Sequence, residues 1–189
     1  MKYCTAELYS QQQLVGDEFD DAESDRITTA SEAWDKSLAA YEKRLAEIRA
    51  DLPESVRQFL EVGLLHDADF ECWNASCLER AFPRRLQFVV RQNNWGPDKY
   101  LYVLRYKLVP PDPFAEEYQP QTKWALHKLP GFVNPEPPYN PQWMYDEFDV
   151  VAPGVYEHNV LMSDGVELNI RFSEFSFIRV PVGENVIEH

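Results

Sequence analysis

The repeat of apolar residues changes once along the chain, at Gly63, and this change decides the fold class. Before Gly63, apolar residues recur every three or four positions, as in a helix with one buried face. Beyond it, apolar and polar residues alternate, as in strands with one buried face. A helical part over 1–63 and a sheet part over 64–182 predict one α+β domain across residues 1–189, with N-terminal helices packed on an antiparallel sheet of about five to seven strands.

The clearest helical pattern lies in the segment 29–52. Thr29 and Glu32 have the spacing of a capping box, so we expect this helix to begin at Thr29. Its apolar residues fall on one stripe: Trp34, Leu38, Tyr41, Leu45, Ile48 and Leu52. The stripe is shorter than about three heptads, which favours packing within the domain over a coiled coil.

Two shorter helices are expected beside it. The first runs over residues 5–14 with Thr5 as its N-cap. The second has Pro53 in its first turn and ends at Gly63. Its apolar side consists of Val56, Phe59 and Leu60.

The chain is strongly acidic, with 32 Asp and Glu against 18 Lys and Arg and a net charge of −14. Residues 16–25 hold six acids and no base, which predicts an exposed loop. The charge repels phosphate backbones, so we do not expect nucleic-acid binding, and it favours a basic protein partner. No apolar run reaches the roughly 20 residues of a membrane span and no secretory signal is visible, so we expect a cytoplasmic protein without membrane association.

Strands are expected wherever the alternation holds. They cover residues 64–72, 84–92, 100–108, 143–151 and a hairpin over 155–172 that continues to 180. The polar faces of the second and third strands are basic, and we expect weak cross-strand pairs with acids of the first strand. The bases are Arg85, Arg91, Arg105 and Lys107, and the acids are Asp67, Asp69 and Glu71.

The hairpin over 155–172 admits two registers. A two-residue turn at Asp164-Gly165 would pair Val160 with Asn169. A three-residue loop that includes Ser163 pairs Val160 with Leu168 instead, keeps apolar residues together and gives Gly165 a left-handed position. We therefore predict the three-residue loop, followed by a bulge near 173–174 where the alternation slips.

The segment 110–141 holds nine of the 14 prolines, so it is not a central strand. It is also rich in aromatic residues, which predicts an ordered excursion packed on the domain. Long loops of this kind often carry function. A small-molecule pocket beneath the excursion is one functional hypothesis.

The segment GLLHDADFECW, residues 63–73, contains an adjacent His66-Asp67 pair. If the chain is extended there, neighbouring side chains point to opposite faces, so the pair cannot grip one metal ion. His66 and His158 both fall on expected core faces, and Asp146 lies on such a face too, so these three are candidate metal ligands. The competing interpretation is that each histidine sits in the core with its nitrogens hydrogen-bonded.

Other chemistry has little support in the sequence. There is no G-x-S-x-G motif and no glycine-rich phosphate loop, so we expect no catalytic residues of those kinds and no cofactor. The cysteines Cys4, Cys72 and Cys77 form no C-x-x-C pair and are expected to be reduced thiols.

Three blocks carry a resemblance: MKYCTAELY at the start, LLHDADF at 64–70 and EHNVLMSDGVELNIRFSEF at 157–175. Together they resemble a family of uncharacterised bacterial proteins, a domain of unknown function whose members open with a Met-Lys-Tyr-Phe-Thr-Lys-Glu-Leu-like block. Cys4 and Ala6 depart from that block. The family has no established activity, so the resemblance implies no functional residues. The architecture also resembles that of several small bacterial immunity proteins.

The leading functional hypothesis is a non-enzymatic bacterial protein that binds another protein, as an immunity-type or regulatory factor. Its basis is the acidic charge, the aromatic and proline-rich excursion and the lack of a catalytic motif. The alternatives are a metal-dependent enzyme centred on His66 and His158, and a small-molecule binder beneath the excursion.

Overall fold

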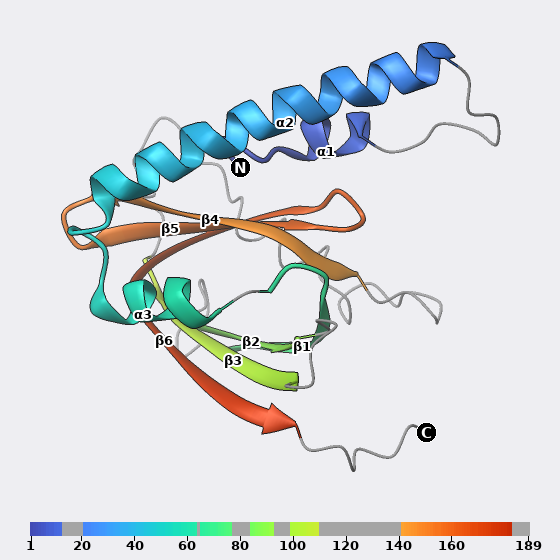
Figure 1. Ribbon diagram of the computed structural model, residues 1–189. Helices are drawn as coiled ribbons and strands as arrows, with labels where there is room; N and C mark the ends of the chain where they lie inside the picture. The colour runs from blue at the N-terminus through green and yellow to red at the C-terminus, as the bar shows by residue number, and fades with distance from the viewer. Residues whose placement is uncertain (13–20, 64, 77–83, 93–98, 110–140, 183–189) are drawn as a thin grey trace, which may run out of the picture.

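A computed structural model describes residues 1–12, 21–63, 65–76, 84–92, 99–109 and 141–182 (Figure 1). Within these ranges the chain forms three helices and then six strands, which confirms the α+β class. The elements are α1 (Ala6–Gln11), α2 (Asp21–Ile48), α3 (Glu54–Val62), β1 (Ala68–Ser76), β2 (Arg85–Arg91), β3 (Lys99–Leu108), β4 (Gln142–Ala152), β5 (Val155–Met162) and β6 (Glu167–Val182). Residues 110–140, nearly all of the proline-rich excursion, lie outside the described residues.

The strands form a closed barrel in the order β1-β2-β3-β6-β5-β4, with every neighbouring pair antiparallel. The closing contact between β1 and β4 is short: Ala68 pairs with Trp143 and Asp69 with Gln142. The other pairings run for most of their strands. Closure was not predicted from the sequence, and it encloses an aromatic-rich core that no single strand face reveals.

The long helix α2 crosses the outer side of β4 and β5 (Figure 1). Its apolar stripe faces the barrel as predicted, with Trp34, Tyr41 and Ile48 buried. The Trp34 ring packs against Tyr145 of β4 with ring centroids 4.5 Å apart. The Tyr41 hydroxyl accepts a 2.7 Å hydrogen bond from the backbone N–H of Phe148. The β4–β5 ribbon is therefore buried on both faces.

The short helix α3 lies beside β6 (Figure 1). Its Phe59 is buried in the barrel core. The ring of Phe59 makes edge contacts with Tyr102, Phe148 and Phe175 at centroid distances of 5.5–6.3 Å. Gly63 ends the helix as predicted, and a Cβ there would lie 2.5 Å from the Phe59 ring. The Phe59 ring thus occupies the space that a side chain at position 63 would need, so this position requires glycine.

Two helix boundaries differ from the prediction. The helix α2 begins at Asp21, so residues 21–25 of the expected acidic loop are helical. Acids near a helix N-terminus interact favourably with its dipole, which offsets part of their mutual repulsion. Thr29 is therefore not a cap, and its hydroxyl donates to the Asp25 carbonyl one turn back. Pro53 is the N-cap of α3 rather than part of its first turn, whereas Thr5 caps α1 as predicted, its Oγ1 accepting from Leu8.

The first strand also differs from the prediction. It begins at Ala68, and His66 and Asp67 lie in the preceding turn, where Asp67 has φ 60°. The doublet is therefore not divided between two faces of a strand, and His66 Nε2 lies 3.5 Å from Asp67 Oδ2. A register shift between Phe70 and Cys72 then turns Cys72 outward, although regular alternation from the buried Phe70 would turn it inward.

The hairpin of β5 and β6 has the predicted three-residue register. Val160 pairs with Leu168 and Glu157 with Arg171. Gly165 has φ 78°, the left-handed conformation that the loop requires. The predicted bulge is confirmed as well, because the pairing of β3 with β6 shifts between Phe172 and Glu174.

Three buried carboxylates line the outer face of the β4–β5 ribbon: Glu147, Asp149 and Glu157. Asp149 bonds to the ammonium of Lys2 and to Arg44 at 2.9 and 3.2 Å. Burial disfavours its ionised form, but these bonds and one from the Val150 N–H outweigh burial and hold the pKa of Asp149 below its usual value. Asp149 thus contributes to stability as an ionised group.

We expect Asp149→Asn to lower the free energy of unfolding at pH 7 by about 1–2 kcal/mol, because it removes the charge that Lys2 and Arg44 bind. The stability that this ionised carboxylate contributes is fully present above the pKa of the unfolded state, about 4. It is lost as the pH falls through the lower pKa of the folded state. Urea unfolding from pH 7 down to about 2.5 should therefore show the gap between the native protein and the variant closing below pH 4. Asp35→Asn on the exposed side of α2 serves as the control. A gap that stays constant over this range would contradict the assignment.

Candidate functional site

A hydrogen-bonded network of four side chains lies inside the barrel. His158 of β5 is fully buried, with Nδ1 2.8 Å from the Tyr106 hydroxyl and Nε2 3.0 Å from Asp146 Oδ2. Its ring stacks on Phe148 at 3.8 Å between centroids. Trp143 Nε1 donates to the second oxygen of Asp146 at 3.4 Å. Both ring nitrogens of His158 therefore have protein partners.

The proton positions in this network follow from burial. Burial, and next the nearby Asp146, raise the pKa of Tyr106 well above its usual value, so its hydroxyl stays protonated and can donate to His158 Nδ1. Nε2, on the opposite side of the ring, lies 3.0 Å from Asp146 Oδ2, where an N–H would donate to the carboxylate. Aromatic rings surround the imidazole, which leaves it no approach for a substrate.

His66 lies on the other side of β4 from His158. Its Nδ1 donates to the Met144 carbonyl at 2.7 Å, and its ring packs on Tyr145 at 4.8 Å. Tyr145 and Asp146 are neighbours in a strand, and neighbouring side chains point to opposite faces. The structure therefore joins His158 with Asp146 but keeps His66 apart from them.

No group of three or more His, Cys, Asp or Glu side chains is arranged to hold a metal ion within the described part of the chain. Nor does Cys4 offer a reactive thiol. Burial, followed by the charges of Glu147 and Asp146, raises the pKa of Cys4 to about 12, so its thiol stays protonated.

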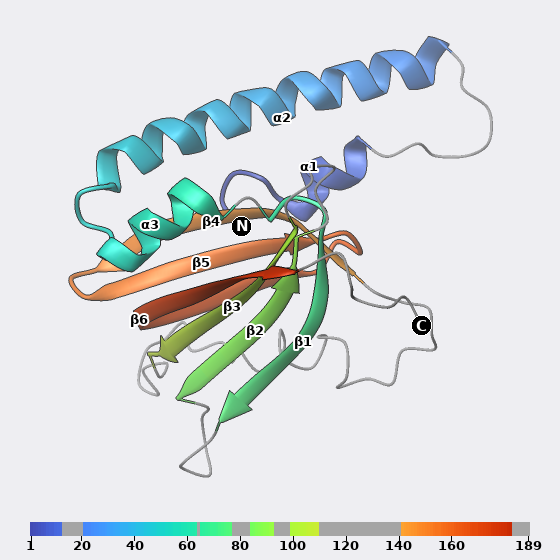
Figure 2. The same cartoon turned by 60° about the horizontal axis from the view of Figure 1, so that its bottom comes forward.

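The outer face of β1, β2, β3 and β6 lies on the side of the barrel away from α2 (Figures 1 and 2). Strand register arranges its outward side chains in rows that cross the strands. A polar pair of rows contains Arg85 and Lys107 opposite Glu174, then Asn74, Gln87, Arg105 and Ser176. The next two rows contain most of the outward apolar side chains: Cys72, Val89, Val103 and Ile178 in one, and Leu101 and Val180 beside Arg91 in the other. We call these the basic rows and the apolar rows.

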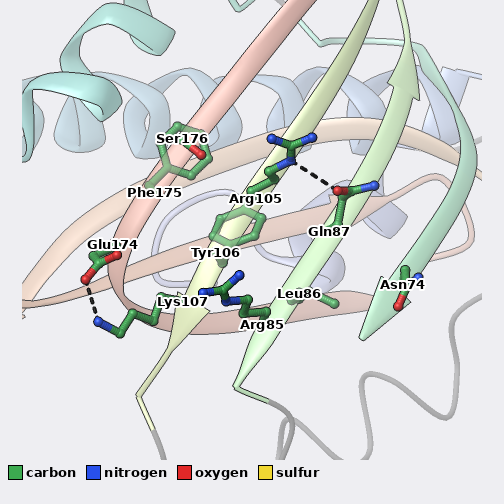
Figure 3. Close-up of a pocket in the computed structure, with 10 residues that line it drawn as sticks. All are labelled: Asn74, Arg85, Leu86, Gln87, Arg105, Tyr106, Lys107, Glu174, Phe175 and Ser176. Carbon is green, nitrogen blue, oxygen red and sulfur yellow. Dashed lines mark hydrogen bonds and ion pairs between the residues drawn. The ribbon is translucent and has the colours of Figure 1, made fainter. Parts of the chain in front are cut away.

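A cavity of about 500 Å³ lies over the basic rows (Figure 3). Its lining includes Arg85, Arg105 and Lys107, all exposed. The other lining residues are the outward-facing Asn74, Gln87, Glu174 and Ser176 and the inward-facing Leu86, Tyr106 and Phe175. Of the internal network, Tyr106 is among the lining residues but is only 2% exposed, and His158 and Asp146 are not among them.

The groove carries positive charge on a strongly acidic protein. Three cations, Arg85, Arg105 and Lys107, face one carboxylate, Glu174, which Lys107 already binds. Arg105 donates from Nε to Gln87 Oε1 at 3.1 Å, which orients the guanidinium (Figure 3), and no described residue binds its terminal nitrogens. Among the described residues, Arg85 has no hydrogen-bonding or ion-pair partner. Two guanidinium groups are thus available to an anion.

The apolar rows leave aliphatic side chains in water. Ile178 is 44% exposed and Val180 43%, and both rank among the most exposed large apolar residues described. Val103 pairs with Ile178 and Leu101 with Val180, so the apolar side chains adjoin one another. A contiguous exposed apolar patch next to a charged groove is typical of a contact surface.

Sequence reasoning located part of this face. It placed Arg85, Arg91, Arg105 and Lys107 on outward positions, but as partners of acids in the first strand. Only Arg91 makes such pairs, with Asp69 and Glu71. The usable signal was the recurrence of bases at every second position along two adjacent strands, and the register was needed to set Ser176 and Asn74 beside them.

We expect His158→Phe to cost about 2–3 kcal/mol of unfolding free energy, because the ring stack survives while the buried Tyr106 hydroxyl and Asp146 lose their partner. In the His158→Phe background, Tyr106→Phe should lower the unfolding free energy by less than it does in the native protein, because the Tyr106 hydroxyl has already lost its partner there. A double-mutant cycle by urea unfolding should give a coupling of about 1 kcal/mol or more. Additive costs would contradict a shared network.

No described helix has the length and apolar character of a membrane span. Comparisons with protein-family models, curated proteins and solved structures find no match to this chain. The resemblance to a bacterial family of unknown function therefore stays a prediction, and the function has to be argued from the geometry of the barrel itself.

Proposed function

We propose that this protein is a non-enzymatic binding protein that contacts another protein through the outer face of β1, β2, β3 and β6. The observation that carries the proposal is the pattern on that face, where exposed aliphatic rows adjoin a basic groove. Interfaces combine an apolar centre with a polar rim in this way. A cytoplasmic, regulatory or immunity-type role, as expected from the sequence, fits this activity.

The reactive groups of the described residues give less support to an enzyme. His158 is enclosed by rings and bonded at both nitrogens, and the Cys4 thiol is protonated. The metal-dependent alternative required His66 and His158 to share an ion, and the two lie on opposite sides of β4. The small-molecule hypothesis concerns the proline-rich excursion, which lies outside the described residues.

A photo-crosslinking amino acid placed at Ser176, in the centre of the face, tests the proposal. In the native host cell we expect a discrete adduct with another protein, identified by mass spectrometry. The same amino acid at Ala39, exposed on α2, should give no such adduct. Ile178→Glu in the Ser176 probe should lower the adduct yield about fivefold, because it charges an apolar row.

Thermal unfolding of each variant checks that the barrel is intact. We expect little change in the melting temperature, because Ser176, Ala39 and Ile178 are all exposed. An adduct of equal yield from Ala39, an unchanged yield in the Ile178→Glu variant, or no adduct from Ser176 would overturn the proposal. An adduct between two copies of this chain would instead make the face a dimer interface.

A further inference from the structure

We infer that the partner presents an extended acidic segment, whose carboxylates bind Arg85 and Arg105 in the groove while its apolar residues cover the apolar rows. The inference rests on the proposed function and specifies the chemistry of the partner. The net charge of −14 alone would favour a basic partner. At contact distance, however, the local charge decides, because salt screens charges farther away than about 8 Å.

The charges of the groove favour carboxylates. Three cations against one carboxylate leave a local surplus of two positive charges (3 − 1 = 2). Gln87 holds Arg105 through Nε, so the guanidinium is already oriented and its two terminal nitrogens can bind one carboxylate together. A guanidinium fork matches the two oxygens of a carboxylate, which gives short, charge-assisted hydrogen bonds.

The spacing of the rows favours an extended peptide. Arg85 and Val89 face outward on one strand four positions apart, which is about 13 Å along an extended chain. A peptide lying along β2 would therefore carry its acids and its apolar residues about four positions apart. A compact anion could fill the groove but would leave the apolar rows in water.

The same face disfavours a nucleic acid. Single-stranded nucleic acids bind through aromatic side chains on which bases stack. The outward side chains described on this face are aliphatic, polar or charged, with no aromatic ring among them. A charged phosphate backbone would also leave the side chains of the apolar rows without an apolar partner.

A fluorescein-labelled peptide provides the test. Its length is about twelve residues, with alternate Glu residues near one end and alternate Leu and Val near the other. A matched peptide has Gln in place of each Glu. Fluorescence anisotropy with the full-length protein should show the Glu peptide binding about tenfold more tightly than the Gln peptide at low salt, and the difference should shrink as salt rises.

Variants locate the binding. We expect Arg85→Gln combined with Arg105→Gln to weaken binding of the Glu peptide about tenfold and to leave the Gln peptide nearly unchanged. Arg49→Gln is the matched control, because Arg49 is an exposed cation on the helical side and pairs with Glu61. It should change affinity by less than about twofold.

Several results would overturn the inference: equal binding of the two peptides, an equal loss in the Arg49→Gln variant, or no measurable binding of the Glu peptide at about 1 mM. Tighter binding of a single-stranded oligothymidine with the same arginine dependence would favour a nucleic acid instead. If the arginine substitutions leave the Ser176 adduct intact while Ile178→Glu abolishes it, the protein interface stands and the acidic segment is refuted. If neither change affects the adduct, both proposals are refuted.

Discussion

The carboxylate of Glu147 accepts hydrogen bonds from three successive backbone N–H groups, those of Lys2, Tyr3 and Cys4, at 2.6–3.0 Å. It sits in a strand that is buried on both faces, where an unpaired charge would be very costly. The N-terminal segment supplies the missing donors and in return acquires a fixed place on the barrel. The helix α2 then lies over the same ribbon, and Asp149 adds a second charged tie through Arg44.

This covering divides the barrel into two unlike sides. On the β4–β5 side, apolar rings and paired carboxylates are enclosed beneath helices, so that surface is already used for folding. On the β1–β2–β3–β6 side, the described residues expose aliphatic rows and open guanidinium groups. Folding therefore accounts for the polar residues of the first side, whereas on the second side Arg85 has no partner among the described residues and Arg105 is held only through Nε, which makes that side the better candidate for recognition.

Local signals made much of this fold predictable. The register of the β5–β6 hairpin followed from Gly165 and from the alternation around it, and both act over a few residues. Barrel closure was not predictable, because it depends on two residue pairs between β1 and β4 that are remote in sequence. The start of α2 was misplaced because charge density outweighed helix-end electrostatics in the interpretation of residues 16–25. The groove was only half foreseen, since Arg85 and Arg105 were expected to be neutralised by neighbours that lie elsewhere.

The bulge near Ser173 has a consequence beyond local geometry. Phe172 and Phe175 are three positions apart, yet both face the interior, which a regular strand forbids. The extra residue reverses the orientation of everything that follows, so the aromatic side chains of β6 stay in the dry interior while Ile178 is turned toward water. Deleting one residue here would reverse the orientation of the side chains that follow, so that Phe175 would face the solvent and Ile178 the barrel interior. One extra residue in β6 thus determines which of its side chains are buried in the core and which are available at the surface for binding.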